Sequence, residues 1–282
     1  MYRDPVFQKI IDRALKEDQS HHDITTNILV PENQISKACI IVRQEAVICG
    51  LDVAKYIFKK FDPKMKFTFF CKDGDRLKRN CKVVCLKGKT RAILTGERLV
   101  LNFMAYLSGI STETNKFVKK AHPYQVKIMD TRKTIPGLRA LVKMAVRTGG
   151  GVNHRFNLKE MVMIKDNHLI AYKREKTIEN AIKHVRKKTR KIIVIEVDSL
   201  IQFKQALDAQ PDIILLDNMS PRQLKKSVKI NNESKNKCLL EASGGITLRT
   251  IRAVAKTGVD RISIGALTHS PNAIDFSMEF KG

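Results

Sequence analysis

In the second half of the chain, short apolar segments repeatedly lead directly into clusters of polar residues or glycines. Helical sequence fills most of the gaps between them. This alternation predicts buried parallel strands separated by helices, as in a β/α barrel, where the carboxyl ends of the strands carry the chemistry. The segments are VKIMDTRKT (126–134), MVMIKDNH (161–168), KIIVIEVDS (191–199), DIILLDN (212–218), LLEASGGI (239–246) and RISIGAL (261–267).

The predicted strand ends carry many ionisable side chains. Acids and bases that meet at one end of a barrel are costly to hold together unless a binding or catalytic site uses them. The alternative is a set of solvated loops that happen to begin with charged residues. These side chains are Asp130, Arg132, Lys133, Lys165, Asp166, Glu196, Asp198, Asp217 and Glu241.

The first hundred or so residues have a different rhythm, which predicts an α+β module with a mostly antiparallel sheet. We expect the barrel to begin near Tyr124. We also expect a helical break at Ser108-Gly109. The predicted helices are 5–17, 51–61, 97–107 and 112–120, and the predicted strands are 36–48, 65–71, 82–87 and 89–95.

The chain is strongly basic, with a formal net charge of +25. Three interpretations compete: a nucleic-acid-binding face, a positive field that attracts an anionic substrate, and a solvated lysine surface. Lysines outnumber arginines and gather in exposed-looking helical stretches, which favours the solvated surface for most of the charge. Aromatic residues make up only 6% and tryptophan is absent, so a base-stacking surface is not expected.

The six cysteines show no paired spacing of the kind that zinc sites use. We therefore expect reduced packing residues in a cytoplasmic protein. No apolar run approaches the roughly 20 residues of a membrane helix. The first ten residues, MYRDPVFQKI, lack the apolar core of a signal peptide.

Two motifs favour an anion site. DTRKTIPGLR (130–139) brings Arg132, Lys133 and Arg139 together, and arginine forks suit carboxylates or phosphates. TGGGVNHR (148–155) places glycines, whose backbone amides can approach an anion, before His154 and Arg155. The alternatives are a solvated loop for the first motif and a structural histidine for the second.

The later strand ends predict further chemistry. Lys165 suits either a Schiff-base nucleophile or a group that holds phosphate or carboxylate. Glu196 and Asp217, at successive strand ends, suit a divalent metal with retained waters or ribose hydroxyls. SGGI (243–246) and IGAL (264–267) follow the last two strands, where many barrels bind phosphate. We therefore expect an anionic, phosphorylated substrate set with magnesium.

Taken as a set, these motifs resemble the quinolinate phosphoribosyltransferase family. The resemblance runs in order from about residue 23 to residue 276 and includes GERLVLNFMAYLSGIST, AVRTGGGVNHRFNL and ISIGALTHS. It implies magnesium-dependent formation of nicotinate mononucleotide, carbon dioxide and diphosphate from quinolinate and phosphoribosyl diphosphate, in NAD biosynthesis. It also implies an α/β fold with two domains. They are an N-terminal open sandwich (1–110), joined by the returning segment 273–282, and a C-terminal incomplete, TIM-like α/β barrel (111–272).

The resemblance also implies roles for single residues. Arg98 would enter the site of a partner subunit, which implies a homodimer with shared active sites. Lys133 and Lys165 would lie near the quinolinate carboxylates, and either one would assist decarboxylation. Glu196 and Asp217 would face the ribose hydroxyls and Mg²⁺. Quinolinate would bind Arg132, His154 and Arg155 with Thr131 in the substrate site, and the 5′-phosphate would bind Ser243, Gly244, Gly245 and Gly265.

Three other functions compete with this one. A nicotinate phosphoribosyltransferase of related fold would accept one carboxylate and release no carbon dioxide. A Schiff-base aldolase would form a covalent adduct on Lys165. A nucleic-acid-binding protein would bind duplex DNA with a steep salt dependence. A dicarboxylate ligand is favoured by the combination of Arg98, Arg132, His154 and Arg155. Because aromatic residues are few and no apolar run is long enough for a membrane helix, we expect neither nucleic acid nor a membrane as a partner.

Overall fold

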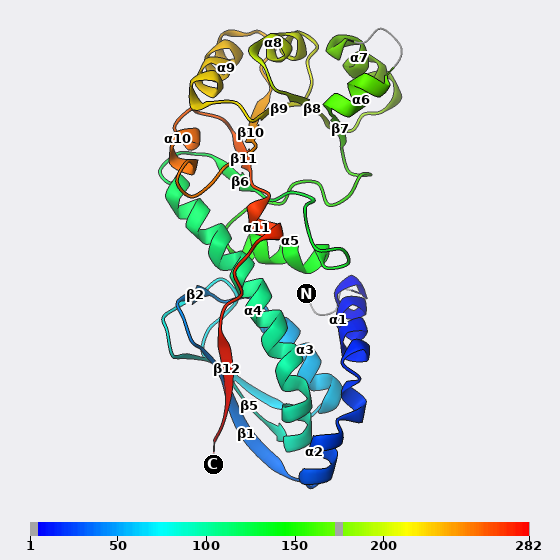
Figure 1. Ribbon diagram of the computed structural model, residues 1–282, viewed down its shortest axis with the longest axis vertical. Coiled ribbons are helices and arrows are strands. Elements are labelled where there is room, and N and C mark those ends of the chain that lie inside the picture. Colours follow the sequence, from blue (N-terminus) through cyan, green and yellow to red (C-terminus); the bar gives the residue numbers. More distant parts are fainter. Residues whose placement is uncertain (1–4, 173–176, 282) are drawn as a thin grey trace. The chain divides into compact units, whose positions relative to one another are not determined.

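The computed structural model describes residues 5–172 and 177–281 (Figure 1). The expected domain limits also include residues 1–4, 173–176 and 282, which lie outside the described residues. Internal contacts divide the chain into two compact units that interleave along the sequence. In the described part, the first unit takes residues 5–115, 134–150 and 267–281, and the second takes 116–133, 151–172 and 177–266.

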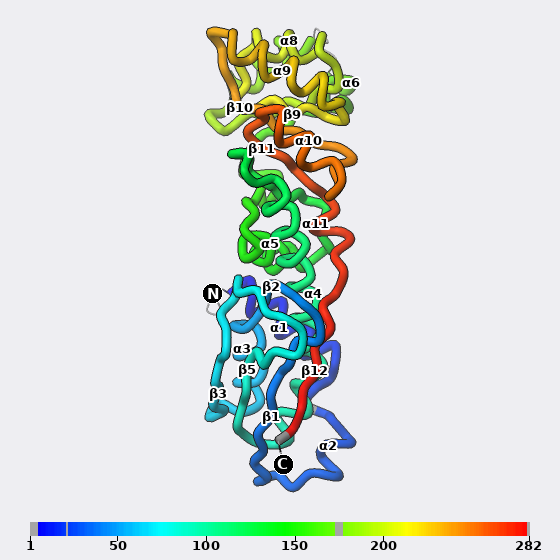
Figure 2. Tube along the Cα trace, turned by 90° about the vertical axis from the view of Figure 1, so that its left-hand side faces the viewer, coloured from blue at the N-terminus to red at the C-terminus, as the bar shows by residue number. Residues whose placement is uncertain are grey.

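The first unit is built on an antiparallel sheet with strand order β12-β1-β5-β3. The last strand of the chain pairs with β1 from Lys37↔Lys281 to Val42↔Phe276, so the C-terminal segment lies beside the N-terminal strand (Figure 2). A small separate sheet joins β2 to β4. The strands are β1 (Ile35–Val42), β2 (Ala46–Val47), β3 (Lys66–Phe69), β4 (Arg76–Leu77), β5 (Cys81–Lys89) and β12 (Phe276–Lys281).

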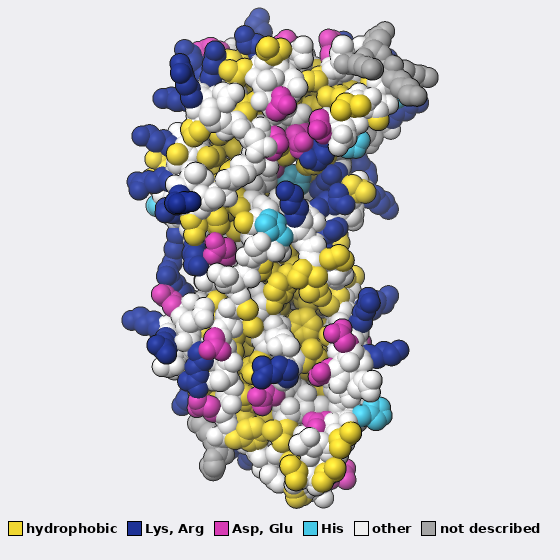
Figure 3. Space-filling view, in the orientation of Figure 1, with side chains coloured by type: hydrophobic (Ala, Val, Ile, Leu, Met, Phe, Trp, Pro, Cys, Tyr) yellow, Lys and Arg dark blue, Asp and Glu magenta, His cyan; other side chains and the backbone are white. Residues whose placement is uncertain are grey.

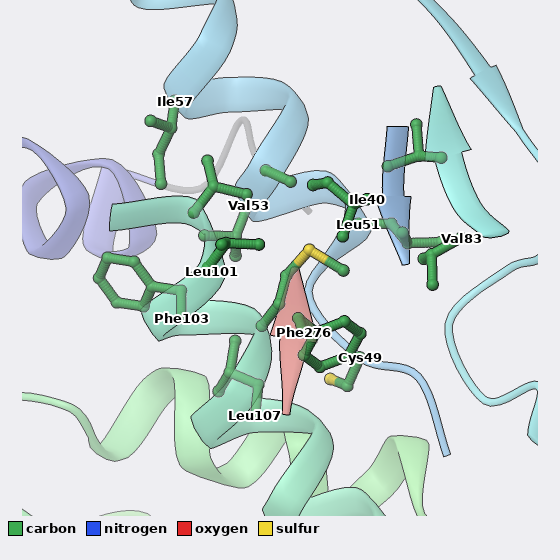
Figure 4. Close-up of a cluster of buried hydrophobic side chains, with 14 of the residues drawn as sticks. Ile40, Cys49, Leu51, Val53, Ile57, Val83, Leu101, Phe103, Leu107 and Phe276 are labelled. Carbon is green, nitrogen blue, oxygen red and sulfur yellow. The ribbon is translucent and has the colours of Figure 1, made fainter. Parts of the chain in front are cut away.

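Helices pack against this sheet through apolar faces. Apolar residues recur at helical spacing in α1 and α3, as in any amphipathic helix that covers a core. Figure 4 shows the resulting cluster, in which side chains of α3 and α4 meet those of β1, β5 and β12. The helical elements are α1 (Pro5–Glu17), the 3₁₀ turn η1 (Ser20–His22), α2 (Ile24–Leu29), α3 (Leu51–Phe61), α4 (Thr90–Ala121), α5 (Arg139–Thr148) and α11 (Ala266–His269).

Two predicted helices are confirmed with their bounds, residues 5–17 and 51–61. The predicted strand 36–48 is wrong in one respect, because it breaks after Val42 into β1 and β2, which join different sheets. The predicted strand 89–95 is wrong, because β5 continues through Gly88 to Lys89 and the helix begins at Thr90.

The predicted helical break at Ser108-Gly109 is also wrong, since α4 runs unbroken from Thr90 to Ala121. Tertiary packing explains both residues. The Ser108 hydroxyl donates to the Cys49 carbonyl at 3.1 Å. A Cβ on Gly109 would collide with the carbonyl oxygen of Asn272. Ser108 and Gly109 therefore allow neighbouring backbone segments to pack closely against α4, and they do not end the helix.

One expectation about the cysteines is corrected. Cys39 and Cys85 form a disulfide between β1 and β5, where the antiparallel register places the two residues opposite each other. They are 46 residues apart in sequence, and spacing alone gives no sign of the pairing. Cys49, Cys71, Cys81 and Cys238 are free thiols. Burial raises the pKa of the Cys49 thiol to about 12, which suits an inert packing residue.

The second unit contains a parallel sheet with strand order β6-β11-β10-β9-β8-β7. The near-continuous apolar runs of β8 and β9 suit strands covered on both faces. Helices α7 to α10 surround these strands in Figure 1. The strands are β6 (Lys127–Met129), β7 (Val162–Ile164), β8 (Ile193–Val197), β9 (Ile213–Asp217), β10 (Leu239–Ser243) and β11 (Arg261–Ser263), and the helices are α6 (Asp166–Ala171), α7 (Ile178–Lys188), α8 (Leu200–Asp208), α9 (Pro221–Glu233) and α10 (Ile251–Ala255).

The sheet forms an incomplete, TIM-like α/β barrel. The rhythm of the strand ends predicted the barrel, and the family resemblance implied that it would be incomplete. An isolated parallel bridge between Met129 and Val152 adds one more extended segment beyond β6. The edges of the barrel are therefore the segment around Val152 and strand β7. No helix of the described chain is both long and apolar enough to cross a membrane.

Candidate active site

The barrel strands bring the predicted site residues onto one face. Paired residues of neighbouring parallel strands project to the same side, and alternate residues of one strand share a side. Glu196 pairs with Leu215, which pairs with Glu241, and Asp217 pairs with Ser243. Val152 pairs with Met129 on the opposite edge, so His154, two residues later, continues that face. Figure 3 shows acidic and basic side chains gathered side by side over this unit.

Lys165 and Glu196 form an ion pair between the Nζ and Oε2 atoms. Lys165 follows the end of β7, and Glu196 lies near the end of β8. The lysine side chain is 42% exposed and the glutamate only 17%, so the pair stands at the rim of the barrel with the carboxylate beneath the ammonium. A substrate that arrives there meets both a cation and an anion.

The loop after β9 contacts the loop after β10. The Asp217 Oδ2 accepts a hydrogen bond from the Asn218 side chain at 2.8 Å. The Asn218 amide donates to the Ser243 carbonyl at 2.9 Å. A Cβ on Gly244, whose φ is +93°, would lie 2.8 Å from the Asn218 backbone nitrogen and nearer still to its side chain. Only glycine therefore allows these loops to approach, which keeps the Ser243 segment beside Asp217.

Two arginines of the site lie close enough to repel each other. Burial and then the charge of Arg132 lower the pKa of the Arg155 guanidinium. Arg155 is held by donating from Nη1 to the Met161 carbonyl at 3.1 Å and from Nη2 to the Met163 sulfur at 3.5 Å. Neighbouring cations in a partly buried place are costly unless an anion binds between them. The two arginines are therefore a candidate anion site.

His154 is buried and held on three sides. Its backbone amide donates to the Asp130 carboxylate at 2.7 Å, and its Nδ1 accepts from the Arg155 amide at 2.8 Å. Its Nε2 lies 3.4 Å from the Glu241 carboxylate. His154 thus connects the Asp130 carboxylate, the Arg155 backbone and the Glu241 carboxylate.

The remaining predicted residues lie in several places. The Thr131 hydroxyl accepts from the amide of Lys133, whose side chain is exposed. Gly265 follows β11, and Gly245 has open space around it with a φ of +59°. Arg98 is exposed on α4 in the first unit. Gly149, read from sequence as part of an anion-binding glycine run, lies instead against Ser111 and Thr114 of α4 and serves helix packing.

Two residues have contacts that the sequence did not assign. Glu241 appears in sequence only as one more acid at a strand end, and nothing in its spacing links it to His154. Asn218 directly follows Asp217, and its positive φ of 52° marks it as a structured loop residue. Asparagine after a strand end is a weak signal for such a turn.

The carboxylates of the site do not form a metal cage. Among the described residues there is no group of three or more His, Cys, Asp or Glu side chains arranged to hold a metal ion. Glu196 lies in β8 and Asp217 is the last residue of β9, and the strand register places both on the inner face, with the enclosed Glu241 below them. Two carboxylates suit a magnesium ion that keeps several waters and takes further ligands from a phosphorylated substrate.

Comparison with known proteins gives consistent similarities. Residues 23–108 match the model of the quinolinate phosphoribosyl transferase N-terminal domain, and residues 110–279 match that of its C-terminal domain. A probable carboxylating nicotinate-nucleotide pyrophosphorylase of Methanocaldococcus jannaschii is 39% identical, with 96% of each chain covered. The carboxylating enzyme of Mycobacterium leprae is 38% identical, with 95% of each covered.

Solved structures agree. The nicotinate-nucleotide pyrophosphorylase of Francisella tularensis superposes with a TM-score of 0.90 at 39% identity, covering 98% of this chain and 96% of that one. The enzyme of Ehrlichia chaffeensis superposes with a TM-score of 0.91 at 39% identity, covering 98% of both. Human nicotinic acid phosphoribosyltransferase, at 10% identity and a TM-score of 0.65, shares the fold alone, with 94% of this chain and 73% of that one covered.

Proposed function

The chain belongs to the quinolinate phosphoribosyltransferase family, and from this premise we propose the reaction that its site performs. The enzyme transfers the phosphoribosyl group of phosphoribosyl diphosphate to quinolinate and removes one carboxylate. The products are nicotinate mononucleotide, diphosphate and carbon dioxide, in NAD biosynthesis. The names of the close relatives, carboxylating pyrophosphorylases, support this reaction over that of a nicotinate phosphoribosyltransferase.

The observation that carries the proposal is the pair of neighbouring arginines. The charge of Arg132 contributes to lowering the pKa of Arg155, so the two guanidinium groups lie within electrostatic reach. A pyridine dicarboxylate brings two anionic groups, and each arginine offers a planar fork suited to one of them. We assign the quinolinate carboxylates to Arg132 and Arg155, with Thr131, Lys133 and Lys165 around them. His154, whose two ring nitrogens face the Arg155 amide and Glu241, supports this site from behind.

The second substrate is assigned to the other side of the barrel end. Ser243, Gly244, Gly245 and Gly265 follow the late strands, where loop amides are placed to hold a 5′-phosphate. The close approach of Gly244 to Asn218 supports this assignment, because it holds the loop after β10, with its backbone amides, close to Asp217. Glu196 and Asp217 would then face the ribose.

In the proposed mechanism, the pyridine nitrogen of quinolinate forms a bond to the anomeric carbon of ribose while the bond to diphosphate breaks. Glu196 and Asp217 stabilise the positive charge that develops on the sugar. The product ring is a pyridinium, which accepts the electron pair of the breaking C2–carboxylate bond as carbon dioxide leaves. A proton then replaces the carboxylate at C2, and Lys133 or Lys165 supplies it or shields the charge.

Magnesium is part of the proposal. Glu196 and Asp217 would hold it as the two protein carboxylates, directly or through water, since Mg²⁺ prefers oxygen ligands and keeps several waters. When bound, the ion would neutralise charge on the leaving diphosphate. The chain's own residues orient the two reactants around it.

We also propose a homodimer with shared active sites. Arg98 is exposed on α4, so its guanidinium is accessible to a second copy of the chain. A cation contributed by the partner would add to the positive charge around the diacid. We propose that the enzyme acts in the cytoplasm.

The deciding experiment is a product assay. The purified protein is mixed with quinolinate labelled in the C2 carboxylate, phosphoribosyl diphosphate and Mg²⁺, and released carbon dioxide and nicotinate mononucleotide are measured. We expect equal amounts of both products. A parallel assay contains nicotinate in place of quinolinate. Turnover of nicotinate, together with no carbon dioxide release from quinolinate, would establish the rival phosphoribosyltransferase instead.

A further inference from the structure

Glu241 is a carboxylate enclosed within the barrel. It occupies the third position of the central strand β10, and its side chain is 0% exposed. Neither of its carboxylate oxygens has a hydrogen-bond partner among the described residues. The one cation-forming group within ion-pair distance in that part of the chain is the His154 ring, whose Nε2 lies 3.4 Å from Oε1. The acid therefore cannot reach a substrate directly, and its contact in the site is His154.

The surroundings of His154 determine where its ring proton lies. The Arg155 amide can only donate, and it donates to Nδ1 at 2.8 Å, so Nδ1 must present its lone pair. The single proton of the neutral ring is then on Nε2, the nitrogen that faces Glu241. The backbone amide of His154 is held separately by Asp130 at 2.7 Å. The ring thus spans from β10 to the backbone of Arg155.

We propose that Glu241 is a positioning residue for quinolinate binding, an inference that rests on the function proposed above. The Glu241 carboxylate faces Nε2 of His154 at 3.4 Å and favours the tautomer with its proton on that nitrogen, which keeps Nδ1 available to the Arg155 amide. The arginine backbone is thereby held at the place from which its guanidinium reaches the anion site beside Arg132. Glu241 acts through His154 and Arg155 and touches no substrate atom.

Stability alone does not account for this acid. A buried ionic or polar pair contributes little net stability, and apolar side chains of similar volume often replace it without loss. The same face of the barrel is filled at neighbouring positions by Ile213 and Leu215, together with Val194, so an apolar residue suits that environment. The carboxylate is explained by the orientation that it gives to His154.

The orientation has a chemical consequence for the site. Two cations beside each other resist being held together, and Arg155 is already partly desolvated. Its guanidinium is restrained at Met161 and Met163, and its backbone is restrained at His154. Loss of the backbone restraint would let Arg155 withdraw from Arg132 when no ligand is bound. The diacid would then have to reassemble the pair as it binds, which weakens its affinity.

Two substitutions test the role. Glu241→Leu removes the acceptor at similar volume, and Glu241→Gln keeps an acceptor oxygen but no charge. We expect Glu241→Leu to raise KM for quinolinate by about tenfold or more, by analogy with the loss of carboxylates that orient metal-binding histidines. We expect KM for phosphoribosyl diphosphate to stay within about twofold. The glutamine variant should recover much of the quinolinate affinity.

Asp260→Asn provides a matched control. Asp260 also holds β10, because its Oδ2 accepts the amide of Leu240, the residue before Glu241, at 2.7 Å. This variant should leave KM for quinolinate unchanged even where its stability falls. A rise in KM equal to that of Glu241→Leu would show that any disturbance of β10 has this effect and would overturn the positioning role.

A spectroscopic measurement reads the wild-type protein directly. Ring nitrogen shifts of ¹⁵N-histidine-labelled protein should show His154 protonated at Nε2 and bare at Nδ1, and Glu241→Leu should mix the two tautomers. A proton on Nδ1 in the wild type, or a wild-type KM in Glu241→Leu, would refute the inference. The wild-type product assay tests a different claim, because absence of quinolinate turnover there would reject the proposed function. The tautomer measurement and the comparison with the Asp260 control test the positioning role of Glu241.

Discussion

Lys165 and Glu196 form an ion pair across the ends of the adjacent parallel strands β7 and β8. The lysine is assigned to the diacid and the glutamate to the ribose, so the pair stands at the boundary between the two substrates. On binding, the diacid would offer Lys165 a new carboxylate partner, and the ribose would offer Glu196 new hydroxyl partners. Because the pair is partly exposed, its own contribution to stability is small, and exchanging partners costs little. The predictions below follow from this arrangement and its neighbours.

Replacing Arg132 by alanine should abolish useful quinolinate binding while the fold stays intact. Truncating one partner of a close charge pair costs about 2–5 kcal/mol, which corresponds to at least about a thirtyfold loss of affinity. Calorimetric titration with quinolinate measures it. Arg222→Ala, on the exposed start of α9, is the matched control and should bind normally. Retained affinity in the Arg132 variant would remove this residue from the site.

Glu196→Gln should reduce kcat much more than quinolinate affinity. The glutamate is assigned to the charge that develops on ribose, and loss of one such stabilising group typically lowers kcat by about 100-fold or more. Steady-state kinetics with both substrates separates the two effects. An unchanged kcat with weaker quinolinate binding would instead indicate that the carboxylate serves only to hold Lys165.

Lys165 should form no covalent intermediate. Its Nζ forms an ion pair with Glu196, whereas a Schiff-base lysine needs a free Nζ to attack a carbonyl. Treatment with borohydride and a carbonyl substrate, followed by intact mass measurement, is expected to leave the mass unchanged. A stable adduct that disappears in Lys165→Met would support the aldolase alternative.

Gly244→Ala should weaken phosphoribosyl diphosphate binding more than Gly245→Ala. Both residues have positive φ, +93° and +59°, so alanine at either costs about 1–2 kcal/mol in backbone strain. Only at Gly244 does the added Cβ also collide with Asn218, whereas Gly245 has open space. Binding titrations of both variants measure the difference, and equal losses would exclude the loop contact as its cause.

Asp212 should stabilise the barrel in a pH-dependent way. Burial raises its pKa, but the Ile193 amide and the charge and hydrogen bond of Arg186 outweigh it, so the pKa is lowered below 3.8. A lowered pKa means that the stabilisation is present above the unfolded value near 4 and is lost as pH falls through the folded value. Asp212→Asn should cost about 1 kcal/mol at pH 6.

Urea unfolding of wild type and Asp212→Asn between pH 6 and pH 3 measures this. The difference in free energy of unfolding between the two proteins should decrease as the pH falls below about 4. Asp208→Asn, an exposed acid on α8 of the same unit, serves as the control and should show a small effect throughout. A gap that persists unchanged to pH 3 would contradict the assignment.

Local signals in the sequence were sufficient for several elements. Helices 5–17 and 51–61 follow from their apolar spacing, and the barrel strands follow from apolar runs that end in polar clusters. They failed where a distant segment decided the outcome. The strand predicted at 89–95 became the start of α4, and Ser108-Gly109 stayed helical because the Cys49 carbonyl and the Asn272 backbone lie against it.

The sequence by itself determined which chemical groups this protein has and the strand ends at which they stand, because hydrophobic period and turn residues act over a few neighbouring positions. Only the tertiary structure decided which of those groups meet. The pairing of Cys39 with Cys85, of Lys165 with Glu196 and of His154 with Glu241 depends on strand order and register. Those are settled by packing between segments far apart in the chain, where spacing along the sequence carries no information.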